Sequence, residues 1–125
     1  MQRRNVAGTR LGALEAEVLD QLWAAGEPLG ARELTAQLPG PRRAYTTVVT
    51  VLTHLIDKGL VRRAGDGRRY LYSPAGDPAQ LTARAIETLL AAAADRRAVL
   101  AHLIEEAKDP GLLDELAALL RESQP

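Results

Sequence analysis

The chain has 125 residues, no cysteine and a formal net charge of zero, which fits one domain or one domain with a small appendage. Zero cysteine excludes disulfides, thiolate metal sites and cysteine nucleophiles, and it fits a reducing cytoplasm. Its longest apolar run, residues 89–94, is too short to span a bilayer. Residues 1–10 carry arginines with no apolar segment behind them, so we expect a flexible N-terminus and no secretory signal.

The zero net charge hides an uneven distribution. Residues 1–80 hold 11 Lys/Arg and 8 Asp/Glu, a charge of +3, whereas residues 81–125 hold 5 and 8, a charge of −3. Within residues 42–72 there are 7 basic and 2 acidic residues, a charge of +5. A neutral average can contain a basic patch, and such a patch is what meets phosphates.

Two helices are predicted in the first forty residues. The first runs from Leu11 to Trp23 with apolar residues at helical spacing, and Gly26 ends it. After a short extended link, residues 31–38 form the second helix. Pro39-Gly40-Pro41 ends this helix, because proline lacks the donor needed to continue it.

The third predicted helix, residues 44–58, has two unlike faces. At about 100° per residue the apolar positions fall together; they are Val48, Val51, Leu52, Leu55 and Ile56. The opposite face and its flank are polar and include Thr46, Thr47, Thr50, Thr53, His54 and Asp57. Solvated helix faces usually carry Glu, Lys, Gln and Arg, which are better helix formers than threonine. Four threonines on this face and its flank therefore indicate a partner for that side of the helix.

A hairpin follows the third helix. Gly59 suits a left-handed helix stop, and Leu60–Arg63 and Arg69–Tyr72 are the predicted strands. Gly65-Asp66-Gly67 between them supplies the positive φ angles that a tight hairpin needs. The order helix, helix, helix, strand, strand predicts a winged helix-turn-helix over residues 11–76, with the wing at about residues 62–72.

Residues 77–125 are predicted as a tail of three amphipathic helices, which begin at Asp77-Pro78, Asp95 and Asp109-Pro110. Residues 81–125 contain 13 large aliphatic residues, and burial of each is worth roughly 1.5–3 kcal/mol. They could pack back on the same chain, but a second tail is the partner that we expect. The predicted dimerisation residues are Leu81, Ala85, Leu89, Leu90, Val99, Leu100, Leu103, Ile104, Leu112, Leu113, Leu116, Leu119 and Leu120. The fold class is thus mainly α with a small β-hairpin: a winged helix-turn-helix head followed by a helical dimerisation tail.

The threonine face suits DNA. Short side chains let a helix backbone approach the major groove, and threonine offers a hydroxyl for phosphates or base edges and a methyl group for thymine. The first turn of the helix also favours phosphate, and arginines stand before it and at the wing tip. From these features the predicted DNA contacts are Arg42, Arg43, Thr46, Thr47, Thr50, Thr53, His54, Lys58, Arg62, Arg68 and Arg69.

Five segments carry a resemblance to a known family. LGALEAEVL at 11–19, LW at 22–23, AYTTVVTVL at 44–52, KGLV at 58–61 and YLYSP at 70–74 resemble the penicillinase-repressor family of bacterial winged-helix transcriptional regulators (BlaI/MecI type). The resemblance implies a cytoplasmic homodimer that represses transcription by binding a palindromic double-stranded DNA operator, with no cofactor and no membrane insertion. It also places Tyr45 with Thr46, Thr47 and Thr50 in the recognition helix, and Arg68 and Arg69 in the wing.

The inducing signal is open. Antibiotic-resistance members of the family are inactivated by a membrane sensor-protease at an Asn-Phe bond in the tail, whereas this chain has no phenylalanine and carries Ala101-His102 at the approximate place. Cutting elsewhere by such a protease stays an alternative. Copper-responsive relatives have a cysteine cluster that this chain lacks.

Other chemistry has little support in the sequence. His54 and His102 are the only histidines, too few for a site of about four ligands, so no metal is expected. Neither a GxxxxGK loop nor a GxSxG elbow is present, and no enzyme activity is expected. Two alternatives remain, a winged helix used for protein interaction and a small-molecule-responsive regulator. The first would need an apolar patch on the threonine face or the wing, and the second would need apolar or aromatic walls for its ligand.

Overall fold

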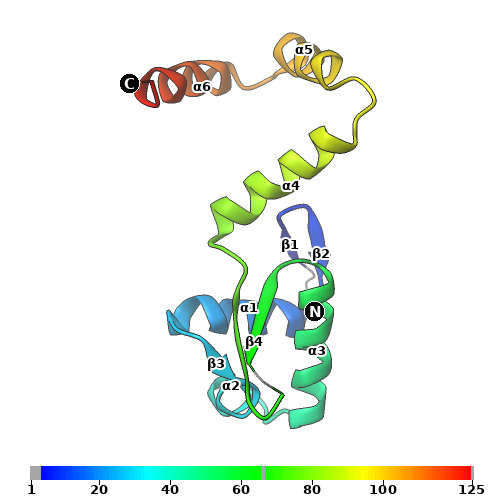
Figure 1. The fold of residues 1–125 in the computed structure, drawn as a ribbon, viewed down its shortest axis with the longest axis vertical. Helices are drawn as coiled ribbons and strands as arrows, with labels where there is room; N and C mark the ends of the chain where they lie inside the picture. Colours follow the sequence, from blue (N-terminus) through cyan, green and yellow to red (C-terminus); the bar gives the residue numbers. More distant parts are fainter. Residues whose placement is uncertain (1–3, 66, 125) are drawn as a thin grey trace. The chain divides into compact units, whose positions relative to one another are not determined.

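The computed structural model describes residues 4–65 and 67–124, which fall into two units, Met1–Ile86 and Glu87–Pro125. The first unit is a winged helix-turn-helix head in which three helices gather beside a small sheet (Figure 1). Its elements are β1 (Arg4–Val6), β2 (Thr9–Leu11), α1 (Ala13–Ala25), β3 (Leu29–Gly30), α2 (Ala31–Gln37), α3 (Tyr45–Asp57), β4 (Val61–Gly65) and β5 (Tyr70–Pro74). The predicted fold class, mainly α with a small β-hairpin and a winged helix-turn-helix head, is confirmed, whereas dimerisation through the tail stays a prediction.

The three helices begin and end close to where the sequence predicts. Gly26 follows α1 at φ +68°, and Gly59 follows α3 at φ +76°, so both residues adopt the left-handed conformation that glycine tolerates best. The apolar face of α3 is buried against the head, with Val48, Leu52 and Leu55 fully covered. The predicted two-faced character of α3 is therefore confirmed.

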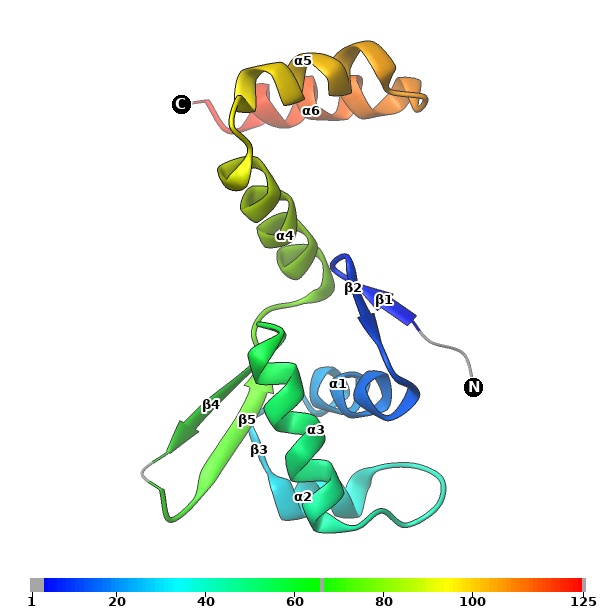
Figure 2. The same ribbon diagram turned by 90° about the vertical axis from the view of Figure 1, so that its right-hand side faces the viewer.

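The wing belongs to a three-stranded antiparallel sheet of order β3-β5-β4. Leu29 of β3 pairs with Tyr72 of β5, so the predicted extended link contributes a short third strand. At the tip, Gly65 pairs with Tyr70, and Gly65 and Gly67 both have positive φ, as predicted. Asp66, the residue between them, lies outside the described residues. Figure 2 shows this hairpin beside α3.

The N-terminal segment differs from the prediction. Residues 1–10 are expected to be flexible, whereas residues 4–11 form the β1–β2 hairpin. Its two-residue loop, Ala7 and Gly8, has positive φ at both positions, as a type I′ turn requires. Val6 and Leu11 are buried in the head core, which stabilises the hairpin. Leu11 consequently belongs to β2 and not to the first helix.

The core of the head extends beyond the predicted boundary at residue 76. Leu81, on the first turns of α4 (Pro78–Ala92), is only 4% exposed and packs in the same core as α1 and α3. The indole Nε1 of Trp23 also donates a hydrogen bond of 3.0 Å to the carbonyl of Gly76. The boundary between the units therefore falls inside α4, after Ile86. Leu81 is removed from the predicted dimerisation residues, because burial in its own chain makes it unavailable to another.

The second unit contains the end of α4, α5 (Arg96–Glu106) and α6 (Pro110–Glu122). As predicted, Asp95 and Asp109 cap α5 and α6 by accepting hydrogen bonds from the amides of Ala98 and Gly111, at 3.0 and 2.9 Å. No residue of α5 or α6 is buried. In the described part of the chain, no helix is both long and apolar enough to cross a membrane.

Most predicted dimerisation residues are exposed in the single chain. Ala85 and Leu90 are half-buried. The exposed ones are Leu89, Val99, Leu100, Leu103, Ile104, Leu112, Leu113, Leu116, Leu119 and Leu120. Ile86, which lies outside the predicted set, is exposed as well. The tail helices thus present their apolar stripes to the surroundings and bury none of them in a core of their own.

Candidate nucleic-acid interface

The polar face of α3 is exposed along its whole length. Thr46, Thr47, Thr50 and Thr53 are all exposed, opposite the buried face of the helix. The Thr50 and Thr53 hydroxyls each donate a 3.0 Å hydrogen bond to the backbone carbonyl four residues earlier. This bond uses the hydroxyl proton inside the helix and leaves the oxygen lone pairs and the methyl group for a partner. Such a face can accept hydrogen bonds from base edges and contact thymine methyl groups.

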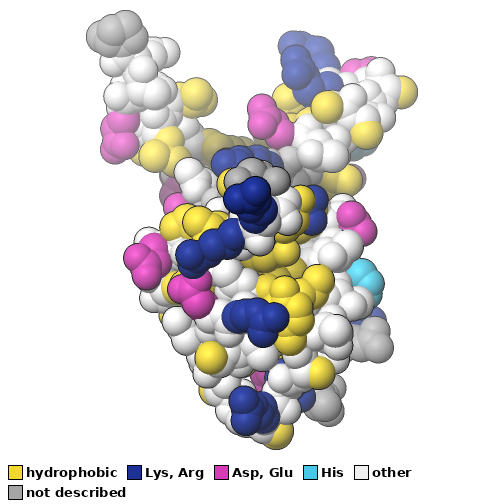
Figure 3. Space-filling view, turned by 60° about the horizontal axis from the view of Figure 1, so that its bottom comes forward, with side chains coloured by type: hydrophobic (Ala, Val, Ile, Leu, Met, Phe, Trp, Pro, Cys, Tyr) yellow, Lys and Arg dark blue, Asp and Glu magenta, His cyan; other side chains and the backbone are white. Residues whose placement is uncertain are grey.

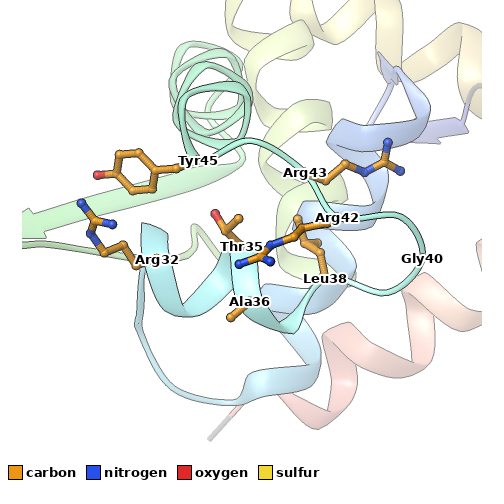
Figure 4. A pocket seen from close by; sticks show the side chains of 8 residues that line it. All are labelled: Arg32, Thr35, Ala36, Leu38, Gly40, Arg42, Arg43 and Tyr45. Carbon is orange, nitrogen blue, oxygen red and sulfur yellow. The ribbon is translucent and has the colours of Figure 1, made fainter.

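Arginines surround the start of α3. Arg42 lies in the turn before the helix, and its side chain borders a hollow of about 570 Å³ between that turn, α2 and Tyr45. Arg32 of α2 reaches the same hollow and stacks on the Tyr45 ring, with its guanidinium carbon 4.8 Å from the ring centroid. Figure 4 shows Arg42 and Arg43 pointing in opposite directions, Arg42 along α2 and Arg43 away from it.

A second hollow, of about 600 Å³, lies between α2 and the wing. Arg32 and Tyr45 line it from one side, and Arg68 and Arg69 of the wing line it from the other. Arg32 and Tyr45 border both hollows, so the two hollows adjoin each other and extend from the turn before α3 to the wing tip. Lys and Arg side chains are spread over this end of the head in Figure 3. From the predicted set, the structure therefore brings together residues that line these two hollows: Arg42, Arg43, Tyr45, Arg68 and Arg69.

Two arginines of the predicted interface are held by carboxylates of the same chain. A guanidinium nitrogen of Arg43 lies 3.3 Å from a carboxylate oxygen of Glu17 in α1, and Arg69 lies 2.7 Å from Glu33 in α2. All four side chains are partly exposed, so each pair contributes about 0–1 kcal/mol to stability. DNA phosphates can replace such weakly held partners.

Three predicted contacts lie away from this group. Lys58 follows the last turn of α3, roughly 20 Å along the helix from Tyr45, and its ammonium pairs with Glu15 at 2.6 Å. His54 is exposed on the last turns of α3, and Arg62 is exposed near the start of β4, away from the wing tip. Their assignment as DNA contacts stays a prediction.

The Glu15 carboxylate ties the start of α1 to the end of α3. Burial raises its pKa, but hydrogen bonds from the Lys58 ammonium and the Gly12 amide outweigh burial, and its pKa lies below the usual range. Lys58 therefore has a structural partner that a DNA contact would have to displace.

The sequence-based set of contacts does not include Arg32, which borders both hollows. A usable signal was present, because Arg32 lies opposite the inward Leu34 and Leu38 at about 100° per residue on α2. The structure confirms both sides of that pattern, since Leu34 and Leu38 are buried and Arg32 is exposed.

Within residues 4–65 and 67–124, no three His, Asp or Glu side chains gather where they could hold a metal ion.

The exposed helix face, the wing and the arginines around them define a winged-helix DNA-binding regulator of transcription. The sequence model of the penicillinase-repressor family matches residues 11–122. The chain is also 42% identical, over 101 residues, to the transcriptional regulator BlaI of Mycobacterium tuberculosis, covering 78% of this chain and 73% of the relative. This chain belongs to the penicillinase-repressor family.

Solved structures of other transcriptional regulators resemble the chain more distantly. A mutant of S. aureus MepR bound to an oligodeoxyribonucleotide is 17% identical, with a TM-score of 0.49, and the match covers 90% of this chain and 76% of that one. The PcaV transcriptional regulator from Streptomyces coelicolor, in complex with its natural ligand, is 26% identical with a TM-score of 0.45. That match covers 80% of this chain and 76% of the other.

Proposed function

We propose that this chain is a cytoplasmic, homodimeric transcriptional repressor that binds a palindromic DNA operator. In each head, α3 enters the major groove, Arg42 and Arg43 contact the flanking backbone, and the wing contacts the adjacent backbone or minor groove. The observation that carries the proposal is the exposed threonine face of α3 with arginines beside its first turn. Short side chains on one face let a helix backbone approach the major groove, and cations at its flanks can bind the phosphates.

The tail supports the dimer. Its apolar stripes are exposed in the single chain, and Leu89 is 74% exposed. A second tail would cover these stripes, and burial is worth roughly 1.5–3 kcal/mol for each large aliphatic residue. Two linked heads would read two half-sites, which matches a palindromic operator. Membership of a family named for repression supports a repressor.

An interaction module for proteins has less support. That use would need an apolar patch on the α3 face or the wing. Tyr45, at 42% exposure, is the one exposed large hydrophobic residue on the described part of this surface. Arg32 already covers one side of the Tyr45 ring. The hollows beside α2 are lined by several arginines, which suits an anionic partner better than an apolar one.

The test is binding of the purified full chain to DNA from its own promoter region and to scrambled DNA at several salt concentrations. Phosphate contacts with base readout predict a preference for the promoter of about a hundredfold or more, and a steep negative dependence on salt. Weak, equal and salt-insensitive binding to both DNAs would contradict the proposal and direct attention to protein partners.

A further inference from the structure

The hollow between α2 and the wing contains an anion of the protein itself. The Glu33 carboxylate, which lines the hollow, accepts a 2.7 Å hydrogen bond from Arg69 of the wing and a 3.3 Å hydrogen bond from the Gly30 amide. Arg32, the residue before Glu33, and Arg68 line the same hollow. One arginine of α2 and two arginines of the wing thus line a hollow in which the Glu33 carboxylate is the negatively charged group.

This site lies between the two elements that the proposed function assigns to DNA binding, α3 and the wing. Tyr45, the first residue of α3, lines the hollow on one side, and the wing tip lines it on the other. A strand that passes from the groove read by α3 to the groove contacted by the wing has to cross the space between them. Arginine is suited to that space because its planar guanidinium can form two hydrogen bonds to one phosphate.

We propose that this hollow binds one phosphodiester of the DNA backbone, with Arg32 as a DNA-contacting residue and Glu33 as an intramolecular competitor of the phosphate. The inference rests on the proposed function, and it adds a site and two residues to it. In free protein, Glu33 holds Arg69. In the complex, the phosphate takes Arg69 and is also bound by Arg32, which is already held in place by its stacking on Tyr45.

The exchange affects every DNA sequence in the same way. A phosphate contact carries no base information. When Arg69 leaves Glu33 for a phosphate, the freed carboxylate offsets part of the positive charge that releases counterions from the DNA. Glu33 therefore lowers general DNA affinity and makes its salt dependence shallower. Such internal competition is consistent with a DNA-binding chain whose formal net charge is zero.

The first test compares Glu33→Gln with Asp20→Asn in the full chain. Glutamine can still accept the Gly30 hydrogen bond, and Asp20 pairs with Arg4 at 2.6 Å in an exposed ion pair at the N-terminal hairpin. Both changes raise the net charge by one. We expect Glu33→Gln to bind promoter and scrambled DNA about two- to fivefold more tightly, with the salt slope steeper by up to about one. Asp20→Asn should bind as the wild type does.

The second test removes the cation, with Arg32→Gln compared with Arg4→Gln. We expect Arg32→Gln to weaken binding to both DNAs by a similar factor and to reduce the salt slope by about one, whereas Arg4→Gln changes neither. Melting temperatures measured alongside confirm that all four variants are folded.

Two results would overturn the inference. If wild type binds the promoter but Glu33→Gln binds no more tightly than wild type, or if Arg32→Gln matches Arg4→Gln, the phosphate site is wrong while the proposed function stands. If the wild type itself shows no salt-dependent binding, both the site and the proposed function are wrong.

Discussion

At the scale of single residues, the Glu15–Lys58 pair gives the head a predictable response to acid. Because the pKa of Glu15 in the folded chain lies below its unfolded value of about 4.3, the stabilisation is fully present above that pH. It is lost as the pH falls through the folded pKa, because the protonated carboxyl no longer attracts Lys58. We expect Glu15→Gln to lower the free energy of unfolding by about 1 kcal/mol at pH 7. In urea unfolding between pH 7 and pH 3, that difference should shrink below about pH 4. A difference that stays constant over this range would contradict the role of the carboxylate.

Gly59, which follows α3, and Gly65, the last residue of β4, allow the cost of backbone strain to be compared with the cost of steric overlap. At Gly59, with φ +76°, an added Cβ would meet no atom within 4 Å, so Gly59→Ala should cost about 1 kcal/mol through its backbone conformation alone. At Gly65, with φ +145°, the Cβ would overlap the backbone carbonyl of Arg69. Gly65→Ala should therefore disrupt pairing at the wing tip and cost more than Gly59→Ala. Urea unfolding with amide exchange along β4 and β5 tests the order, and equal costs would contradict it.

At the scale of elements, a helix or strand can be predicted from sequence when many of its residues indicate the same structure. The α3 helix has five apolar residues on one face and a glycine stop, so its limits and both faces could be predicted from sequence. The β1–β2 hairpin could not, because its turn places Ala7 at φ +51°, where alanine is uncommon and gives no turn signal. Only burial of Val6 and Leu11 in the head core shows why three-residue strands persist there. Tertiary contacts specify this element, and local pattern does not.

The reading role of α3 can be tested by adding charge to its exposed face. Replacing Thr46, Thr47 and Thr50 with glutamate should reduce promoter binding by at least about a hundredfold, because carboxylates would face phosphates and base edges. The melting temperature should stay close to wild type, since all three side chains are exposed. Thr82→Glu is the control, because Thr82 is an exposed threonine on α4 whose hydroxyl also bonds the carbonyl four residues earlier, at Pro78. A triple variant that binds as the control does would show that α3 does not read the operator.

At the scale of the whole molecule, a head and a tail could be predicted from the sequence, but the boundary between them was predicted at residue 76 and lies inside α4, after Ile86. Helical periodicity assigns Leu81, Ala85 and Leu89 to one stripe, yet Leu81 is buried in the head core whereas Leu89 is exposed. Helical periodicity identifies the apolar face of a helix, but it does not show whether the head of the same chain or a second chain covers that face. The same limit explains why Arg32 was missed, because its importance depends on the approach of Tyr45 and the wing, which are remote from it in sequence.

The apolar stripes of the tail are exposed in the single chain, so we predict that a charge placed on such a stripe prevents both dimerisation and tight operator binding. Leu116→Glu places a charge on the α6 stripe, whereas Arg121→Gln changes the net charge by the same amount on the other side of the helix. In sedimentation experiments wild type and Arg121→Gln should be dimers, and Leu116→Glu should be a monomer. Its head should melt as in wild type, because Leu116 is 49% exposed in the single chain. Loss of avidity should weaken binding to a two-half-site operator by about a hundredfold or more while leaving single half-site binding unchanged. A Leu116→Glu protein that remains a dimer with full affinity would place the dimer interface elsewhere.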